Sequence, residues 1–240
     1  MCKGGNFPCY AYRLAHGRLR ERYLANWKVS PPDLIPYGMK YIAPSDNPFY
    51  PRFWAERLRE LDPTTLGGHS SVQPKGIFVC DMGELFGNWV PMKWQEHIFL
   101  LIRKNPWHRF YLLTKQPQNL IKWSPFPENC WVGVTACNAQ MLVNAMYHLK
   151  QIEAPVKYVS LEPLLERIII RNEKAKYRFE FQGINWLIIG QQTPISAKTQ
   201  PKIEWIDEII HAAQKAKIPY FLKNNLKPIM GNNLVQDFPK

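Results

Sequence analysis

From residue 76 to the C-terminus, short runs of β-branched and aromatic residues alternate with stretches whose apolar residues recur at helical spacing. This alternation is typical of β/α units, which build a parallel sheet. The apolar runs predict six strands, at residues 77–80, 109–113, 131–134, 156–161, 186–189 and 219–222. The helical spacing predicts helices between them, at residues 92–104, 117–123, 139–151 and 202–217.

The first third of the chain has a different pattern. Residues 10–26 predict one basic amphipathic helix, and residues 53–61 predict a short second helix. Prolines and glycines crowd the intervening sequence, so we expect residues 27–75 to be mostly an irregular excursion. A charged stretch after the fourth strand predicts a hairpin or a surface insertion at residues 167–182.

Polar residues follow almost every predicted strand. Six parallel strands form either an open doubly wound sheet or a complete or partial barrel, and only in a barrel do all the strand ends meet at one mouth. This favours an α/β fold of the partial or complete TIM-like (β/α) barrel type, with residues 1–240 as one domain. The polar residues are Asp81, Glu84, Thr114, Lys115, Thr135, Glu162, Gln191–Thr193 and Lys223–Asn225. Their mixed charges either neutralise one another or hold a polar substrate.

Composition narrows the class of protein. Hydrophobic residues make up 46% of the 240 residues and aromatic residues 13%, enough to fill a core, so an intrinsically disordered chain is excluded. There are 31 Lys and Arg residues against 19 Asp and Glu, a net charge of +12, which favours an anionic partner. No apolar run is long enough to span a membrane and the start lacks a secretory signal, so we expect a cytoplasmic protein without a membrane partner. Five cysteines, an odd number, agree with free thiols or metal ligands.

The N-terminal text, from Cys2 through Asn6 to Cys9-Tyr-Ala, carries a resemblance. It resembles the phage-associated three-cysteine-motif proteins of unknown function, relatives of radical S-adenosylmethionine (radical SAM) iron-sulfur enzymes, which have Cys-x3-Cys-x2-Cys-Tyr-Ala before a basic helix. Cys2 and Cys9 occupy the first and third cysteine positions, and Asn6 occupies the second. Six further blocks are similar and occur in the same order, beginning at Phe78, Leu112, Cys130, Val159, Trp186 and Phe221.

The resemblance implies a barrel in which cysteines bind a 4Fe-4S cluster and S-adenosylmethionine binds the open iron. Cys2 and Cys9 would be the metal ligands. The remaining site residues would surround the adenosyl cofactor and a substrate, with a nucleobase or nucleotide favoured by the positive charge. Those expected to bind the cofactor are Asp81, Gly83, Glu84, Glu162 and Gln192, and those expected to act in catalysis are Glu84, Lys115, Glu162 and Lys223.

Two departures from the family pattern leave alternatives open. An Asn6 amide is a poor substitute for a thiolate on an iron-sulfur cluster, and the strand that the family has before its first cysteine is missing. Either the N-terminus is a truncated remnant, or the protein has kept the scaffold and given up radical chemistry. A cluster-free barrel that binds nucleic acid or a partner protein without catalysis is the alternative function. A metal-independent enzyme that uses carboxylates as acid and base is a third, so whether the protein is an enzyme stays open.

Overall fold

The computed structural model describes residues 9–34, 44–61, 73–168 and 181–240. The chain divides into two compact units. Of the described residues, unit 1 comprises 9–34, 44–61, 73–112 and 127–130, and unit 2 comprises 113–126, 131–168 and 181–240. That residues 1–240 form a single domain stays a prediction.

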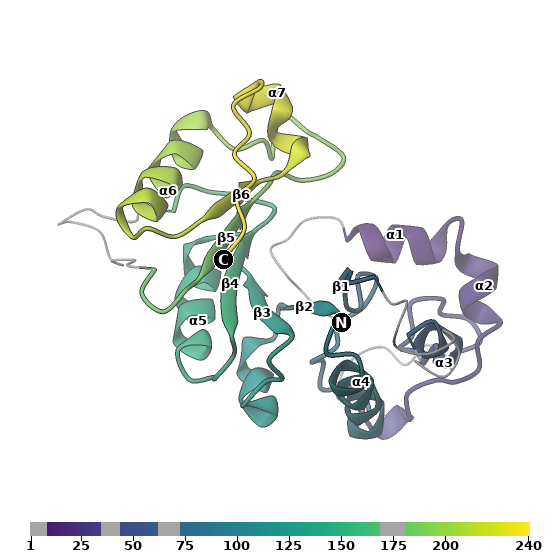
Figure 1. The fold of residues 1–240 in the computed structure, drawn as a ribbon. Coiled ribbons are helices and arrows are strands. Elements are labelled where there is room, and N and C mark those ends of the chain that lie inside the picture. The colour runs from purple at the N-terminus through teal and green to yellow at the C-terminus, as the bar shows by residue number, and fades with distance from the viewer. Residues whose placement is uncertain (1–8, 35–43, 62–72, 169–180) are drawn as a thin grey trace. The chain divides into compact units, whose positions relative to one another are not determined.

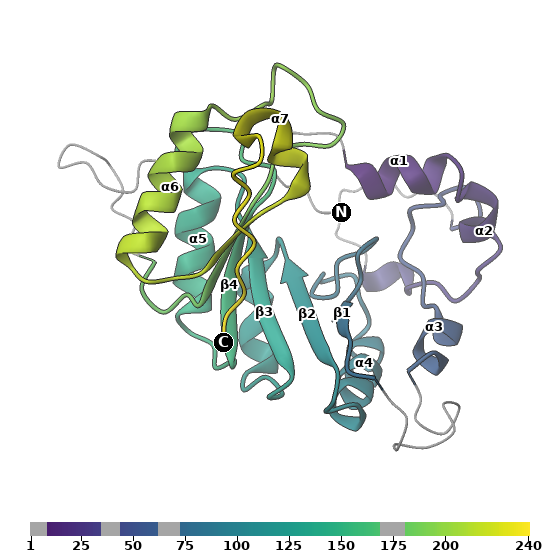
Figure 2. The ribbon, with the colours of Figure 1, turned by 45° about the horizontal axis from the view of Figure 1, so that its top comes forward.

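The fold belongs to the α/β class, and its six strands lie in one sheet in chain order, as in part of a TIM-like barrel (Figures 1 and 2). The pairs β1–β2, β3–β4, β4–β5 and β5–β6 are all parallel. A doubly wound sheet would reverse its strand order at a switch point, whereas a barrel adds each strand on the same side of the last one. The predicted fold class is therefore confirmed. The strands are β1 (Gly76–Phe78), β2 (Arg109–Thr114), β3 (Cys130–Thr135), β4 (Val156–Leu161), β5 (Trp186–Ile189) and β6 (Tyr220–Leu222).

The core of unit 2 forms because its strands are apolar on both faces. Every residue of β3 is buried, and so are the last four residues of β4. Helices α5 (Ala139–Leu149) and α6 (Ile203–Lys215) lie on the same side of these strands (Figures 1 and 2). The Asn138 side chain caps α5 by accepting a hydrogen bond of 2.8 Å from the Met141 backbone N–H. Short turns of helix complete the unit at η3 (Pro117–Trp123), η4 (Asn224–Leu226) and α7 (Lys227–Met230).

Gly133 in β3 is required by a close approach of the neighbouring strand. A Cβ atom at this position would lie 2.3 Å from the aromatic ring of Tyr158 in β4, a distance that atoms cannot adopt. Tyr158 is fully buried, so its ring has no room to move away. The pair fixes how closely β3 and β4 pack.

Unit 1 corrects one predicted helix. The sequence predicts a continuous helix over residues 10–26, but the structure has α1 (Tyr10–His16) and α2 (Arg20–Leu24), with a break at Gly17. A Cβ atom at Gly17 would lie only 2.9 Å from the Arg13 carbonyl oxygen, so the tight turn between the two helices needs glycine.

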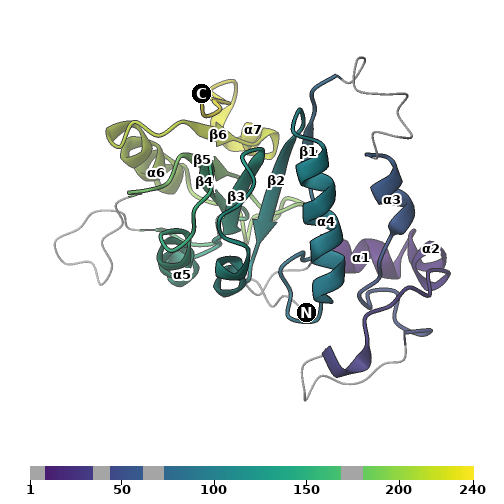
Figure 3. The ribbon, with the colours of Figure 1, turned by 60° about the horizontal axis from the view of Figure 1, so that its bottom comes forward.

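The other helical elements of unit 1 follow the sequence pattern closely. The predicted helix at residues 92–104 is α4 (Met92–Lys104), which runs alongside β1 (Figure 3). The predicted helix at residues 53–61 is shorter, as α3 (Ala55–Arg59), and η1 (Pro32–Leu34) adds a single turn. Parts of two predicted irregular regions, residues 35–43 and 62–72 of the excursion and 169–180 of the insertion, lie outside the described residues.

Arg52 organises the irregular part of unit 1. Its half-buried guanidinium donates hydrogen bonds to the backbone carbonyls of Asn26 (2.9 Å), Asn47 (3.0 Å) and Tyr50 (2.8 Å), and to that of Pro44. Buried carbonyls outside regular secondary structure need such donors, and the planar guanidinium supplies several in fixed directions. One side chain thus joins the segment after α2 to the segment before α3.

The Arg52 network predicts a stability difference between two lysine substitutions in unit 1. Arg52→Lys should lower the free energy of unfolding by about 2–3 kcal/mol, because one ammonium group cannot reach the carbonyls that the guanidinium serves. The control Arg57→Lys changes an exposed ion pair with Glu60 (3.4 Å) and should cost less than about 0.5 kcal/mol. Urea unfolding followed by tryptophan fluorescence measures both. Equal unfolding midpoints for the two variants would show that the network contributes no stability.

Candidate functional site

The parallel register of unit 2 brings residues from three strand ends onto one face of the sheet. Ser160 in β4 lies opposite Ile188 in β5, which lies opposite Phe221 in β6. Side chains return to the same face every second residue. The residues two positions further along are Glu162, Gly190 and Lys223, all just beyond the carboxyl ends of their strands. Two of these, Glu162 and Lys223, are predicted catalytic residues, and the structure brings them together.

Glu162 and Lys223 form an ion pair at this edge. The Lys223 Nζ atom lies 2.7 Å from Oε1 of Glu162 and donates a hydrogen bond of 2.8 Å to Oε2. The Glu162 side chain is 26% exposed and that of Lys223 is 42% exposed, so solvent reaches both partners. The pair therefore carries charge that a ligand can meet, and its own contribution to stability is modest.

Asn225 ties this ion pair to the loop after β5. Its Nδ2 amide donates to the Gln191 carbonyl (2.7 Å), and it lies 3.4 Å from both Oε1 of Glu162 and Oγ1 of Thr193. In return, the side-chain amide of Gln191 donates to the Asn225 carbonyl. The two amides lock the β5 and β6 ends to each other and to Glu162.

Gly190 gives the Glu162 side chain its place. A Cβ atom at Gly190 would lie 3.1 Å from Cγ, Cδ and Oε1 of Glu162, tighter than ordinary van der Waals contact. The carboxylate therefore lies directly over the backbone at Gly190, just beyond β5. A larger residue at position 190 would crowd it. We infer that Gly190 allows the ion pair to sit at the sheet edge.

Three polar atoms near this edge are buried without a hydrogen-bond partner in the described part of the chain. They are Oγ1 of Thr135 at the end of β3 and the side-chain oxygens Oε1 of Gln191 and Gln192 after β5. Thr135 is 2% exposed and Gln191 is 1% exposed. A buried polar atom without a partner costs about 1–3 kcal/mol, so such atoms are rare in folded proteins and need a reason.

Together these groups can bind a polar molecule that offers donors and carries both charges. The two Gln oxygens accept hydrogen bonds, Thr135 can donate or accept, and the ion pair meets an amino group on one side and an anion on the other. Neighbouring strands lie about 4.8 Å apart, so the ends of β3 to β5 span about 10 Å. That span matches a molecule the size of a nucleoside.

The predicted residues after β1 and β2 occupy turns. Asp81 and Gly83 are exposed, and Glu84 is half-buried, with its Oε1 accepting a hydrogen bond of 3.2 Å from the Phe86 backbone N–H. No atom of the described residues lies within 4 Å of a Cβ built at Gly83, so the space beside this glycine is open. Lys115 is half-buried directly after β2. Asp81, Gly83 and Glu84 belong to unit 1, whereas Lys115, Glu162, Gln192 and Lys223 belong to unit 2.

The thiols expected to bind a cluster are only partly within the described residues. Cys2 and Asn6 lie outside them. Cys9 is exposed and directly precedes α1, whose first residue, Tyr10, donates a hydrogen bond to the Asp81 carbonyl. In unit 1, the end of the cysteine motif therefore lies beside the turn that follows β1.

Cys80 lies in that same turn. The residue is exposed, but the atoms packed around its thiol and the carboxylates of Glu84 and Asp81 raise the pKa of that thiol to about 12. With Asn6 at the second motif position, the residues present do not fit the three-thiolate requirement of a 4Fe-4S cluster. The described residues contain no group of three or more His, Cys, Asp and Glu side chains arranged to hold a metal ion.

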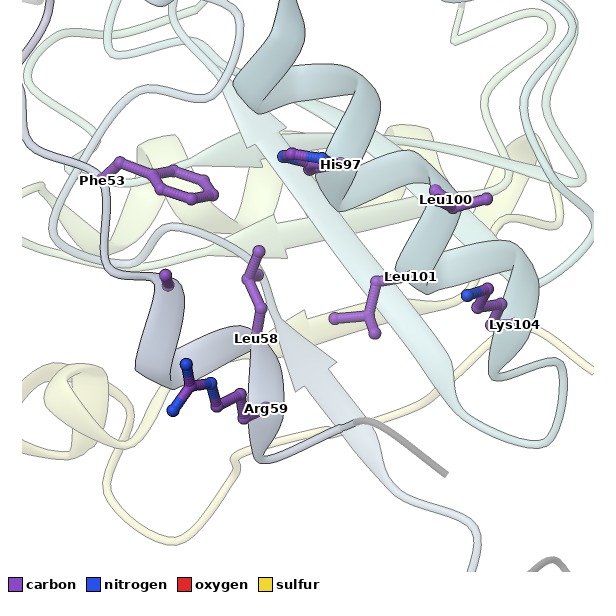
Figure 4. Close-up of a pocket in the computed structure, with 8 residues that line it drawn as sticks. Phe53, Leu58, Arg59, His97, Leu100, Leu101 and Lys104 are labelled. Atoms are coloured by element: carbon purple, nitrogen blue, oxygen red, sulfur yellow. The ribbon is translucent and has the colours of Figure 1, made fainter. Parts of the chain in front are cut away.

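A separate open groove in unit 1, with a volume of about 240 Å³, lies between α3 and α4. Leu58 and Leu101 extend from the two helices into the space between them, and Arg59 and Lys104 lie at its edge (Figure 4). Sequence analysis did not identify this groove, because its lining comes from two helices separated by more than thirty residues. It contains none of the predicted site residues.

Comparison with known proteins places the chain in a family. A family model described as a protein of unknown function (DUF5131) matches residues 4–228. The chain belongs to this family. The DUF5131 match includes Cys9 and all six strands. It also includes the residues described above at the strand ends of unit 2, from Thr135 to Asn225. No curated protein and no solved structure matched the chain.

Sequence reasoning placed Thr135, Gln191 and Asn225 among the polar strand ends but did not select them as site residues. Their roles depend on partners that spacing alone does not reveal, namely the carbonyls and amides of neighbouring strand ends. One signal was available for Asn225, which lies two residues after Lys223 and so shares its alternation. For Thr135 the signal was its position as the last residue of a strand buried throughout.

No helix within the described ranges is both long and apolar enough to cross a membrane.

The unpartnered Thr135 hydroxyl predicts an unusual gain in stability. Thr135→Val keeps the shape of the side chain but removes a buried polar atom without a partner, so the free energy of unfolding should rise by about 1 kcal/mol. The matched control is Thr114→Val at the end of β2, which is also buried but whose Oγ1 accepts a hydrogen bond of 2.8 Å from the Gln116 backbone N–H. That variant should lose about 1 kcal/mol. Urea unfolding of both variants without ligand measures the difference, and a loss of stability in Thr135→Val would contradict the assignment.

Proposed function

We propose that this DUF5131 protein is a relative of the radical S-adenosylmethionine enzymes that binds an adenosyl or nucleotide ligand at the strand ends of unit 2. One observation carries this proposal. The Gln191 side-chain oxygen is buried and unpartnered within the described residues, while its amide nitrogen is held by the Asn225 carbonyl. A fixed acceptor of this kind suits a ligand hydroxyl or amino group, and both are abundant on a nucleoside.

The ion pair of Glu162 and Lys223 suits the amino acid end of S-adenosylmethionine. That end carries an ammonium group, which can donate hydrogen bonds to the Glu162 carboxylate. It also carries a carboxylate, which can accept hydrogen bonds from the Lys223 ammonium. Ribose hydroxyls or the amino group of the base would donate to Gln191 and Gln192. The chain's own residues thus bind and orient the ligand, with Gly190 allowing the carboxylate to approach the sheet.

The cluster expected from the resemblance does not fit the residues present, and the ligand contacts described above do not depend on it. The substrate class, a nucleobase or nucleotide, belongs to the same proposal and is supported by the net charge of +12. An association with phage or prophage and a cytoplasmic location also belong to it, and are supported by the resemblance and by the absence of long apolar runs.

Isothermal titration of the full chain with S-adenosylmethionine, and separately with adenosine, tests the ligand site. We expect S-adenosylmethionine to bind, Glu162→Gln and Lys223→Gln each to weaken it about tenfold or more, and Thr135→Val to weaken it about fivefold. Adenosine lacks the amino acid end, so its affinity should be insensitive to Glu162→Gln and Lys223→Gln.

A second ion pair in unit 2 supplies the matched control for that titration. Arg167 and Glu208 are paired and are 55% and 34% exposed, so Arg167→Gln removes a comparable charge outside the proposed site. This variant should bind like the parent. The proposal fails if neither compound binds at millimolar concentration, or if Arg167→Gln weakens binding as much as Lys223→Gln does.

Anaerobic incubation with iron and sulfide tests whether Asn6 prevents the cysteine motif from binding a complete cluster. With two motif thiolates instead of three, the parent chain should take up far fewer than the four irons of a complete cluster. Asn6→Cys should gain about four irons per chain and a visible absorption band, whereas Asn6→Ser should gain neither. A parent chain that already holds about four irons would show that Asn6 does not prevent cluster binding.

A further inference from the structure

Residues 10–28 of unit 1 present an exposed surface rich in cations. This segment has five basic residues and one acidic residue, Glu21, a greater excess than in the chain as a whole. Arg13, Arg18, Arg20 and Lys28 are all exposed. We call these four cations, with the exposed rings of Tyr12 and Trp27, the basic surface.

The four cations of the basic surface make no ion pair within the described residues, whose ion pairs lie elsewhere in both units. Four unpaired cations within residues 13–28 leave this segment with an excess of positive charge, which favours contact with an anion. An anion with several regularly spaced charges would neutralise the group better than a single small ion.

Exposed aromatic rings accompany these cations. The side chain of Trp27 is 70% exposed, the highest value among the large exposed hydrophobic residues, and that of Tyr12 is 44% exposed. The Tyr12 ring stacks on His16 with a centroid distance of 3.9 Å, so one of its faces already has a planar partner. Leaving an indole in water sacrifices most of the free energy that its burial would release. A planar ligand group that stacks on Trp27 would recover part of it.

Packing and hydrogen bonds hold the backbone around Trp27 in place. Arg22 lies over the Trp54 ring at 5.3 Å, and Tyr23 packs edge-on against the same ring at 5.2 Å. The Asn26 side chain donates a hydrogen bond of 2.9 Å to the Phe53 carbonyl, and the Lys28 carbonyl accepts one of 2.7 Å from the Phe53 N–H. The backbone on both sides of Trp27 is therefore held to the segment before α3.

We propose that the basic surface binds single-stranded nucleic acid. Arg13, Arg18, Arg20 and Lys28 contact phosphates, and an unstacked base packs on Trp27. Alternating phosphates and bases present the regularly spaced anions and planar groups that this surface accepts. In a duplex the bases are stacked inside and cannot reach an indole, so a single strand is preferred. The surface lies wholly in unit 1 and is independent of the ligand site in unit 2.

Fluorescence anisotropy of labelled fifteen-nucleotide oligothymidine and oligouridine, titrated with the full chain at several salt concentrations, tests the proposal. The parent should bind with an affinity that falls linearly with salt on logarithmic axes. Each phosphate contact contributes about 0.7 to that slope for a single strand. Arg13→Gln/Arg18→Gln/Arg20→Gln should therefore reduce the slope by about 2. Comparison of the two affinities shows whether the basic surface prefers single-stranded DNA or RNA.

Trp27→Ala separates stacking from charge. It should weaken binding about five- to a hundredfold, the range for loss of one stacked base, and leave the salt slope unchanged. Because Trp27 is mostly exposed, this variant keeps the fold, which circular dichroism confirms. The matched aromatic control is Tyr147→Ala in α5, which is 65% exposed and should bind like the parent.

The matched charge control is Lys198→Gln/Lys202→Gln/Lys215→Gln, which removes three exposed cations from unit 2. The proposal is overturned if this triple variant loses as much affinity as the arginine triple variant, because binding would then follow net charge alone. It is also overturned if duplex DNA binds as tightly as the single strand, or if no oligonucleotide binds in low salt. Loss of S-adenosylmethionine binding in the unit 2 variants leaves these outcomes unchanged, so the two proposals fail separately.

Discussion

The parallel pairing of β4, β5 and β6 is the constraint on which the candidate site depends. In a parallel sheet with adjacent strands in step, residues that follow different strands at the same distance appear on the same face. Glu162 and Lys223 are far apart in the sequence and share no local motif, yet the register alone brings them into contact across Gly190. A slip of one residue in β6 would turn Lys223 to the other face and leave a half-buried carboxylate without its cation. The chemistry at this edge is therefore a property of the sheet before it is a property of any loop.

Unit 1 is organised by a different principle. Its segment before α3 has little regular secondary structure, so its carbonyls cannot find partners in a ladder. Arg52 provides donors to several of them at once, and aromatic pairs such as Tyr23, packed edge-on against Trp54, supply apolar contact. A single planar cation thus does what a sheet edge does in unit 2, which explains how a proline-rich stretch can hold a defined course.

The sequence predicted the regular elements well, since their signal is local. The bounds of β4, β5 and α4 agree with the predicted ranges at both ends. The two strands are mostly buried apolar runs, which have sharp limits, and the helix is marked by apolar residues at helical spacing. The break at Gly17 was missed, because the apolar spacing continues across it and only the contact with the Arg13 carbonyl shows that the chain must turn. In the site, Glu162 and Lys223 were predicted from charges that abruptly follow apolar runs. The roles of Arg52, Asn225 and Gln191 were not, because their partners are backbone atoms, which every residue carries and which no sequence pattern marks.

The local environment of Cys80 determines the ionisation of its thiol. It has a backbone φ of +57°, a conformation usually left to glycine or asparagine, in a turn that also holds two carboxylates. Peroxides attack the thiolate form of cysteine, and a pKa of about 12 leaves almost none of that form at neutral pH. The turn that exposes this residue therefore also suppresses the reactive form of its sulfur.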